Sequence, residues 1–474
     1  MQSENKGKGN SKQKANKTRS FKIDPKKAQK PQKPQKSKAG EKKNEKAKKA
    51  QRVRHQDYVP GKDLKIIPLG GLGEIGKNMT AFEYGNDIVI VDVGMSFPDE
   101  NMPGVDCVIP DFTYIRRNQS KLRGIVLTHG HEDHIGSLPY FLREFQCPIY
   151  GGTMTIELVR LKLQDKNVPM DGINLTTCRN GDHIRLGNNF DIEFIRVNHS
   201  IADSYALAIR TPVGIVVHSG DFKIDFTPIN GKTIDLQRFG ELGKEGVLLF
   251  MCESTNVEID GFSSSEKHVG EAFSHYFRKA EGRIIVATFS SHVHRMQQII
   301  SAAEKYGRHV CLSGRSMVQV FTLANSLGYI DIKPDTLINI ESIDNYPDDK
   351  IVILTTGSQA EPMSALTRMA FDSHRSVDIQ KGDTIIISAD PIPGNEKPIY
   401  RVINELYKKG AHVIYQSLAD VHVSGHAYRD ELMMLHTLIK PHFFIPVHGE
   451  YRMLCLHKEM AMNLGTEEDN IFIL

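Results

Sequence analysis

One short run of the sequence is crowded with side chains that bind metals. The run THGHEDHIG, Thr128–Gly136, holds three histidines and two acids directly after the apolar residues GIVL. Imidazole and carboxylate are ligands suited to Zn²⁺ and its divalent neighbours. A chance cluster of solvated side chains is the alternative. Metal-competent residues at the end of a buried strand favour a metal centre, with His129, His131, Asp133 and His134 as candidate ligands.

Three more candidate ligands follow apolar strands elsewhere. His199 follows FDIEFIRVN, Asp221 follows GIVVHSG and His448 follows FFIPV. Taken singly, each histidine would more often be a structural hydrogen-bonding residue, but their shared position after strands favours ligands. Seven donors exceed the capacity of one tetrahedral ion, so we expect two ions bridged by a carboxylate and a water, with Asp221 as the bridge. Asp92, which ends IVIVD, is expected to orient a ligand histidine.

The ligands can meet only if the strands before them belong to one architecture. From Leu64 onward the sequence consists of short β-rich runs, with sparser helical patterns at Gly136–Phe145 and Thr155–Gln164. This mixture predicts sheets packed inside covering helices. From about Ser265 helical and strand patterns alternate, which predicts a separate α/β domain with a largely parallel sheet.

A glycine-rich run, GGLGEIG, imitates a dinucleotide-binding fingerprint at Gly71, Gly73 and Gly76. That fingerprint must also open a helix. The residues that follow, KNMTAFEYGNDIVIVD, continue as strand, turn and strand. We therefore expect a tight loop beside a site and not a nucleotide pocket.

The motif series VDVG, THGHEDHIG, VNHS and SGDFK resembles that of the metallo-β-lactamase family. The resemblance implies an α/β fold in the form of an αββα sandwich. It also implies two Zn²⁺ ions per subunit, with Mn²⁺ or Mg²⁺ as alternatives. One ion would be held by His129, His131, His199 and Asp221, and the other by Asp133, His134, Asp221 and His448.

Further motifs resemble the β-CASP branch of that family, which processes nucleic acids. They are CEST, VSGH and PVHGE, and longer runs such as GGLGEIGKN and GSQAEPMSALTRMA resemble the bacterial ribonuclease J family. The likeness covers about residues 63–474 and implies an α/β β-CASP domain inserted into the sandwich. The expected division is a disordered basic tail at 1–62, a first lactamase part at 63–265, a β-CASP domain at 266–430 and a second lactamase part at 431–474.

The sequence departs from the family pattern at its end. Members of the family normally continue well past the last zinc histidine and add a small C-terminal domain that helps dimer formation. Here the sequence stops 26 residues after His448. We therefore expect a truncated second lactamase part and no C-terminal domain, in either a fragment or a shortened form.

The resemblance also implies a mechanism. Two divalent ions ~3.5 to 4 Å apart lower the pKa of a bound water towards ~7 and supply a hydroxide nucleophile. Asp133 would be a catalytic residue of this centre, His426 would donate a proton to the leaving 3′-oxygen, and Glu253 would hold and polarise His426. From the residues alone, His426 would be a loop histidine.

A 5′-phosphate needs a pocket of small residues, backbone N–H groups and hydroxyls. The runs HVSGH and SSH fit this need, and the resemblance places both beside the substrate phosphates, although a Ser/Gly turn is more often merely a turn. Arg295, Arg315 and Arg368 could line the RNA path, although exposed arginines are usually only solvated. The expected substrate-binding residues are Ser290, Ser291, His292, His422, Val423, Ser424, Gly425 and His426.

The function implied is a zinc-dependent ribonuclease with 5′ to 3′ exonuclease and endonuclease activity on single-stranded RNA, preferably 5′-monophosphorylated. It would act in mRNA decay and in maturation of rRNA and other RNAs, as a homodimer or larger RNA-decay assembly in the full-length form. A small-molecule hydrolase such as a thioesterase or lactonase is a second hypothesis, disfavoured by the inserted domain and VSGH. A catalytically idle RNA-binding or scaffolding subunit is a third, disfavoured by the complete ligand set.

The composition is that of a soluble globular protein, with 40% apolar and 25% charged residues. No apolar stretch approaches the ~18 residues needed to span a bilayer, and the N-terminus lacks the apolar segment of a secretory signal. The six cysteines are scattered without a C-x-x-C pair. We expect a reduced, cytoplasmic protein without membrane association.

Basic charge is concentrated at the start of the chain. Residues 1–62 hold 21 Lys and Arg against 5 Asp and Glu, whereas residues 63–474 hold 39 and 52, so the net charge of +3 divides into +16 and −13. The tail is poor in aromatic and β-branched residues, which predicts disorder. Either it binds RNA or the ribosome through counterion release, or it is a solvated extension.

Overall fold

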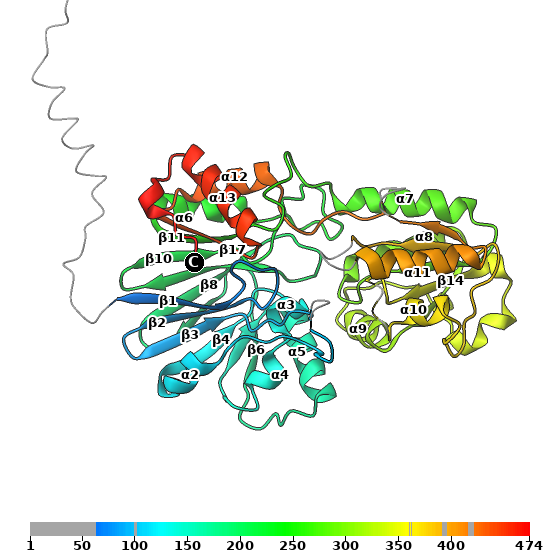
Figure 1. Ribbon diagram of the computed structural model, residues 1–474, viewed down its shortest axis with the longest axis horizontal. Coiled ribbons are helices and arrows are strands. Elements are labelled where there is room, and N and C mark those ends of the chain that lie inside the picture. Colours follow the sequence, from blue (N-terminus) through cyan, green and yellow to red (C-terminus); the bar gives the residue numbers. More distant parts are fainter. Residues whose placement is uncertain (1–62, 99–101, 360, 362, 391–395, 416–420) are drawn as a thin grey trace, which may run out of the picture. The chain divides into compact units, whose positions relative to one another are not determined.

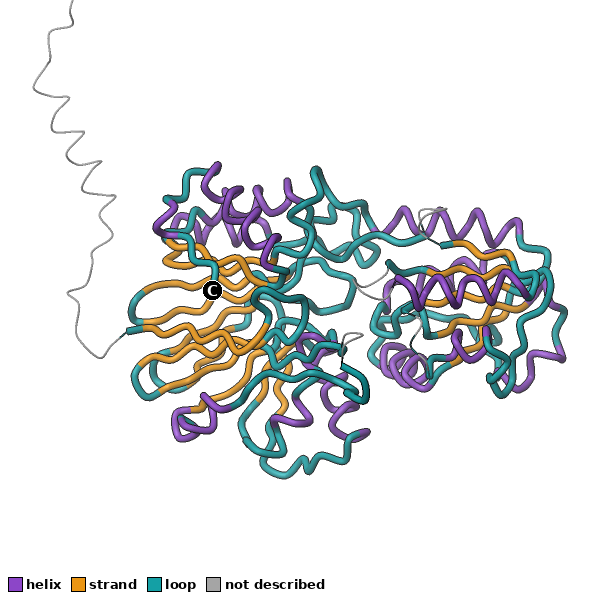
Figure 2. Tube along the Cα trace, in the orientation of Figure 1, coloured by secondary structure: helices purple, strands orange, loops and turns teal. Residues whose placement is uncertain are grey.

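The computed structural model describes residues 63–98, 102–359, 361, 363–390, 396–415 and 421–474 (Figures 1 and 2). The tail predicted to be disordered, 1–62, lies outside the described residues. Val59–Leu474 form one unit, which is built on three sheets. Within the described part of the chain, no helix is both long and apolar enough to cross a membrane.

The first sheet has six strands in the order β1-β2-β3-β4-β5-β6. β1 to β3 are antiparallel, and the later neighbours are parallel. Successive side chains point to opposite faces, so Phe82 and Val89 belong to one core while Ala81 and Ile88 belong to another. The strands are β1 Leu64–Gly70, β2 Met79–Tyr84, β3 Asp87–Val91, β4 Leu122–Val126, β5 Ile149–Gly151 and β6 Leu175–Thr177.

The second sheet also has six strands, in the order β17-β11-β10-β9-β8-β7. β17, β11 and β10 are parallel, and the strands from β10 to β7 are antiparallel. β17 comes from the last part of the chain, drawn in orange and red in Figure 1, and completes this sheet beside β11. The strands are β7 His183–Leu186, β8 Phe190–Arg196, β9 Tyr205–Thr211, β10 Gly214–His218, β11 Val247–Glu253 and β17 Phe443–Val447.

These two sheets share an apolar core that includes Phe82, Val91, Phe194, Leu207 and Met251. Helices cover their outer faces (Figure 2). The predicted αββα sandwich is therefore confirmed. The helices are α2 Thr113–Arg117, α4 Leu138–Phe141 and α5 Thr153–Asp165 on the first sheet, and α6 Leu236–Glu245, α12 Arg429–Ile439 and α13 Tyr451–Asn463 on the second.

The third sheet is wholly parallel, in the order β13-β14-β12-β15-β16. Its helices lie on both faces, as the alternating sequence pattern predicted. The strands are β12 Ile284–Ala287, β13 His309–Ser313, β14 Ile351–Thr355, β15 Thr384–Ile387 and β16 His412–Ile414. The helices are α7 Glu266–Lys279, α8 Val293–Lys305, α9 Arg315–Ser326, α10 Ala365–Ala370 and α11 Glu396–Lys408.

Two local predictions have different outcomes. The helix predicted at Thr155–Gln164 is α5, but the helix predicted at Gly136–Phe145 is wrong in length. Only Leu138–Phe141 is helical there, and Gly136 and Ser137 separate it from a single turn, α3 Glu132–Ile135. The remaining short elements are 3-10 turns: η1 Gln119–Lys121, η2 Ile340–Asn345, η3 Asp348–Lys350 and η5 Glu468–Asn470.

The glycine-rich run forms a tight loop, as predicted, and leads into β2 and not into a helix. Gly71 and Gly73 have φ of 81° and 70°, a left-handed region that glycine adopts without steric cost. The carbonyl of Gly71 accepts a hydrogen bond from the backbone N–H of His448 at 2.8 Å. The loop therefore packs directly beside a candidate ligand.

Candidate metal centre

The candidate ligands gather where strands of both sandwich sheets end. Each lies shortly after a strand, in a loop or, for Asp133 and His134, in the single turn α3, so the strand fixes where its side chain starts. Their oxygen and nitrogen atoms form neighbouring groups in which all ligand atoms lie within 4.8 Å of one another. The strands and the residues that follow them are β3 and Asp92, β4 and His129–His134, β8 and His199, β10 and Asp221, and β17 and His448.

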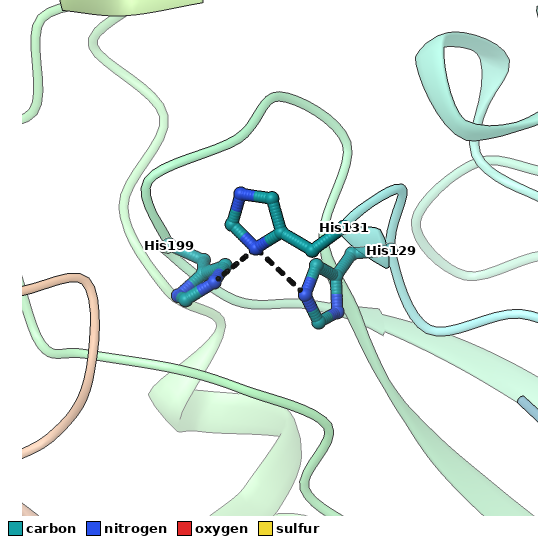
Figure 3. A group of neighbouring side chains, drawn as sticks. All are labelled: His129, His131 and His199. Atoms are coloured by element: carbon teal, nitrogen blue, oxygen red, sulfur yellow. Dashed lines mark hydrogen bonds between the residues drawn. The ribbon is translucent and has the colours of Figure 1, made fainter. Parts of the chain in front are cut away.

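Three histidines form the first group, shown in Figure 3. His131 Nδ1 lies 3.1 Å from His129 Nε2 and 3.0 Å from His199 Nε2. Nitrogens bound to one tetrahedral zinc at about 2.0–2.1 Å stand about 3.3 Å apart. The observed separations therefore suit three ligands of one ion.

Asp133, His134, Asp221 and His448 form the second group. His134 Nε2 lies 3.1 Å from Asp221 Oδ2, and His448 Nε2 lies 3.0 Å from Asp133 Oδ2. Asp221 Oδ2 also approaches the first group, at 3.7 Å from His129 Nε2. Asp221 therefore lies between the two groups, where a bridging ligand is needed.

Hydrogen bonds on the outer side of two rings fix the direction of the inner nitrogens. His199 donates from Nδ1 to the carbonyl of Gly425 at 2.7 Å, and the hydroxyl of Thr255 lies 2.8 Å from His448 Nδ1. Bonds of this kind set the tautomer and orientation of ligand histidines. A Cβ on Gly425 would lie 2.8 Å from Ser200 Oγ and 3.0 Å from His199 Nδ1, so a larger residue would require these side chains to shift.

Asp92 contacts His134 of the second group at Nδ1, the ring nitrogen that does not face Asp221. Asp92 is 1% exposed, and its carboxylate accepts from the N–H and the hydroxyl of Thr128 and faces His134 Nδ1, each at 2.8 Å. Asp92 and His448 have φ of 59° and 51°, in the left-handed region that non-glycine residues rarely adopt. Such strain persists where the surroundings impose it, often at functional sites.

The two groups differ in their charge balance. Burial lowers the pKa of His131 to about 4 and holds those of His129 and His199 well below 6.5, so these imidazoles are neutral at pH 7. Burial acts in the same direction on His134, but the surrounding carboxylates, Asp221 first among them, outweigh it and raise its pKa. Neutral imidazoles beside clustered acids form a donor set that fits Zn²⁺ or Mn²⁺.

Glu253 and His426 form a pair next to these groups. Glu253 Oε2 lies 2.7 Å from His426 Nδ1, and Oε1 accepts from the N–H of Phe222 at 2.7 Å. Burial lowers the pKa of His426, but the Glu253 carboxylate more than compensates and raises it to about 9. His426 Nδ1 lies 3.9 Å from Asp221 Oδ2, so the pair and the ligands belong to one site.

The predicted substrate-binding residues lie on two segments. Ser290 and Ser291 are half-buried just before α8, and His292 is the N-cap of that helix. In the second segment, residues 422–426, the hydroxyl of Ser424 accepts from Asn256 Nδ2 at 2.8 Å. Among the described residues, the buried Nδ1 atoms of His292 and His422 find no hydrogen-bond partner.

The prediction that Arg295 lines an RNA path is wrong. Its side chain is fully buried, and its guanidinium donates to Glu266 at 2.8 Å and to the carbonyl of Val421 at 3.2 Å. A buried guanidinium needs such partners to replace water. Arg295 therefore packs inside the protein, next to the start of the segment at residues 422–426. Of the other two predicted arginines, Arg315 is exposed and Arg368 is half-buried.

Three further residues contact the centre although the sequence did not indicate them as site residues. Thr128 and Thr255 lie inside the quoted motifs THGHEDHIG and CEST, which was the available signal. Asn78 donates from Nδ2 to the carbonyl of Asp133 at 3.1 Å and lies 3.1 Å from His134 Nε2. Asn78 is the last residue of the run GGLGEIGKN, but that run did not indicate the contact with Asp133, which lies 55 residues away.

Comparison with known families agrees with this architecture. The family described as "Metallo-beta-lactamase superfamily" matches residues 72–226, "Ribonuclease J, beta-CASP domain" matches 281–406, and "Zn-dependent metallo-hydrolase RNA specificity domain" matches 410–473. A crystal structure of a protein of unknown function from Enterococcus faecalis is similar, with a TM-score of 0.60 at 18% identity over 82% of this chain and 94% of that chain. That likeness supports the fold alone.

Curated relatives are much more similar in sequence. Ribonuclease J of Synechocystis is 48% identical over 87% of this chain and 64% of the relative, and that of Thermus thermophilus is 44% identical over 87% and 73%. Ribonuclease J of Helicobacter pylori is 44% identical over 87% and 60%. The chain thus spans 60% to 73% of the length of these relatives. It belongs to the ribonuclease J family, within the metallo-β-lactamase superfamily.

Proposed function

We propose that the chain is a zinc-dependent ribonuclease with 5′ to 3′ exonuclease and endonuclease activity on single-stranded RNA, in mRNA decay and RNA maturation. The observation that carries this proposal is the convergence of two ligand groups on Asp221, beside the Glu253–His426 pair. Family membership supports the reaction class, since its relatives are named ribonuclease J.

Two divalent cations would be held by the two groups, with Asp221 shared. When bound, they would lower the pKa of water enough to supply a nucleophile near neutral pH and would offset the charge that develops on the phosphate. Hydrogen bonds at the Nδ1 atoms of three histidines keep their Nε2 atoms directed towards the candidate metal site. The partners are the carbonyl of Gly425, the hydroxyl of Thr255 and the carboxylate of Asp92. The proposed ligands are His129, His131, His199, Asp133, His134, Asp221 and His448.

His426 is the proposed acid for the leaving 3′-oxygen, with Glu253 as the residue that holds it. Because Nδ1 is bonded to Glu253 at 2.7 Å, Nε2 is the atom left to face a substrate. The Glu253 carboxylate stabilises the protonated ring of His426 and raises the pKa of His426 to about 9. Asp133, whose carboxylate lies 3.0 Å from His448 Nε2, is the proposed catalytic aspartate among the candidate metal ligands.

An exonuclease that starts from a 5′-monophosphate must also hold that anion. The proposed pocket consists of Ser290, Ser291 and His292 with residues 422–426. The half-buried side chains of Ser290 and Ser291, just before α8, support this assignment, because serine hydroxyls can donate to a phosphate oxygen. Hydroxyls and backbone N–H groups at a turn are suited to the same anion.

We also propose the division into a lactamase part at 63–265, a β-CASP domain at 266–430 and a second lactamase part at 431–474. The separate third sheet and the return of β17 to the second sheet support it. A homodimer or larger RNA-decay assembly of the full-length form, contact of the tail at 1–62 with RNA or ribosomes, and a cytoplasmic location complete the proposal.

The test uses RNA of one sequence with either a 5′-monophosphate or a 5′-triphosphate, with and without Zn²⁺ or Mn²⁺. We expect metal-dependent release of mononucleotides from the monophosphorylated RNA, slowed about 10²-fold or more in Asp133→Ala and in His426→Ala. Asp171→Ala, at an exposed aspartate, should behave as the wild type. Full activity of both site variants would refute the assignment. Turnover of thioesters or lactones without any cleavage of RNA would favour the small-molecule hydrolase.

A further inference from the structure

Two segments join the third sheet to the sandwich. The outgoing segment, residues 254–265, runs from β11 to α7, and the returning segment, residues 421–428, leads into α12. A third segment, the Asp221 loop at residues 219–227, follows β10 and is hydrogen-bonded to both. The loop that carries the central candidate ligand is therefore also the loop that touches both connections.

Lys223 makes the main link between these three segments. Its ammonium donates to the carbonyl of Ser264 in the outgoing segment at 2.7 Å and to the carbonyl of Ser424 in the returning segment at 2.9 Å. Lys223 is only 1% exposed. Burying an ammonium is costly unless hydrogen bonds replace its water, so its two carbonyl contacts must be kept for the fold to tolerate it.

A buried side chain of opposite charge ties the same segments together. Glu431, which is fully buried, accepts from the N–H of Ile224 at 2.6 Å, of Ser263 at 2.8 Å and of Tyr428 at 2.7 Å. These donors lie in the Asp221 loop, the outgoing segment and the returning segment respectively. Two independent side chains thus fix the junction, which argues against a chance contact of Lys223.

Three consecutive residues of the returning segment contact the candidate centre or residues next to it. The carbonyl of Ser424 is held by Lys223, the carbonyl of Gly425 accepts from His199 Nδ1 at 2.7 Å, and His426 Nδ1 faces Glu253 at 2.7 Å. On its other side, the backbone N–H of Lys223 donates to the carbonyl of Asn198 at 2.8 Å. Lys223 therefore connects the neighbour of His199 to the segment that places His426.

We propose that Lys223 is a positioning residue for RNA hydrolysis: its ammonium sets where residues 424–426 stand relative to the metal ligands. The proposal rests on the function proposed above and adds a residue to which no role has been assigned. Its consequence is kinetic, because a misplacement of about 1 Å at a reacting group can cost about 10²-fold in rate. Lys223 acts through Ser424 and His426 and does not itself touch the substrate.

The first test is Lys223→Met, which keeps the chain length and the apolar stem but removes the charge and the donors. We expect kcat on 5′-monophosphorylated RNA to fall about 30-fold or more, KM to change less than about 3-fold, and bound metal per chain to stay constant. Bis(p-nitrophenyl) phosphate has a leaving group that needs no proton donor. The ratio of RNA to diester turnover should therefore fall about 10-fold or more.

Hydrogen exchange followed by mass spectrometry tests the same proposal without RNA, and so keeps it separate from the proposed function. In Lys223→Met we expect faster exchange in peptides covering 261–266 and 421–428 and unchanged exchange in peptides covering 122–135. Lys267→Met, which removes an exposed lysine near the same junction, should leave both kinetics and exchange as in the wild type.

Three outcomes would overturn the proposal. One is RNA turnover in Lys223→Met within about 3-fold of the wild type. Another is an equal loss on RNA and on the diester together with loss of metal, which would make Lys223 a residue of the metal site or the fold. The third is unchanged exchange in both connecting segments. A wild type that hydrolyses the diester but not RNA would instead refute the proposed function.

Discussion

At the scale of single residues, Asp92 decides which nitrogen of His134 can serve as a ligand. Its carboxylate faces His134 Nδ1 at 2.8 Å, so that nitrogen keeps a proton and Nε2 is free to face Asp221 at 3.1 Å. Thr128 gives the same carboxylate two more hydrogen bonds. Asp92 therefore orients the His134 ring through Nδ1, the nitrogen that would not contact a cation.

Asp92→Asn tests this arrangement. The amide can donate to His134 Nδ1, which shifts the ring proton to Nε2 and blocks the ligand atom. We expect metal affinity to fall about 10- to 100-fold, measured by competition with a coloured chelator. Asp171→Asn, at an exposed aspartate, is the matched control. Equal affinities of Asp92→Asn and the wild type would show that Asp92 has no part in metal binding.

The sequence was enough to nominate the candidate ligands, which the structure brings together, but not most of the residues that contact them. His129 to His134 lie within one run, and the others follow apolar strands, so each carries a local signal. Asn78 and Lys223 lie inside the runs GGLGEIGKN and SGDFK, but their contacts, like those of Glu431, join distant segments, which a local pattern does not reveal. Arg295 was misjudged because a sequence does not distinguish a solvated arginine from one buried against a glutamate.

At the scale of elements, the position of the site depends on two features of the strands: their side chains alternate between two cores, and the candidate ligands follow their ends. Residues of β2 and β3 alternate between two cores, so both faces of the first sheet are buried and its loops start from fixed positions. The sequence predicted these strands well because their apolar runs are short and bounded by turns. It predicted one helix too long, because Gly136 and Ser137 interrupt an apolar pattern that looks continuous.

Glu83 on β2 offers a test of how these elements hold together. Its carboxylate accepts from Lys65 on β1 at 3.0 Å, Lys121 in η1 at 2.9 Å and the hydroxyl of Tyr114 in α2 at 2.6 Å. Burial opposes its ionisation, but these donors outweigh burial and lower its pKa from 4.5 to about 2. The charged form therefore stabilises the fold above pH 4.5, and this contribution disappears as the pH falls towards 2.

Glu83→Gln should lower the free energy of unfolding at pH 7 by about 1–3 kcal/mol, because charged hydrogen bonds are lost. The difference from the wild type should shrink as the pH falls from about 4.5 towards 2. Urea unfolding at pH 7, 4 and 3 measures it, with Glu281→Gln at an exposed site as the control. A difference that stays constant with pH would contradict the role given to the Glu83 charge.

At the scale of the whole molecule, the chain joins a sandwich completed by a late strand to an inserted parallel sheet. The alternating helix and strand pattern predicted a separate α/β domain, and the resemblance to the β-CASP branch implied that it is inserted into the sandwich. The junction itself could not be predicted, because Lys223 and Glu431 hold it through hydrogen bonds to backbone atoms of three distant segments. Residues 63–474 carry a net charge of −13, so the proposed RNA binding would depend on local basic surfaces or on the basic tail.

The central claim is that distant strand ends hold two neighbouring cations that share Asp221. Elemental analysis of the purified, RNA-cleaving chain tests it most directly, carried out beside Asp221→Ala and after treatment with a chelator. We predict about two divalent transition-metal ions per chain, a marked loss of both metal and RNA cleavage in the variant, and loss of cleavage on chelation. A chain that cleaves RNA with no bound metal, or whose cleavage survives chelation, would contradict the account.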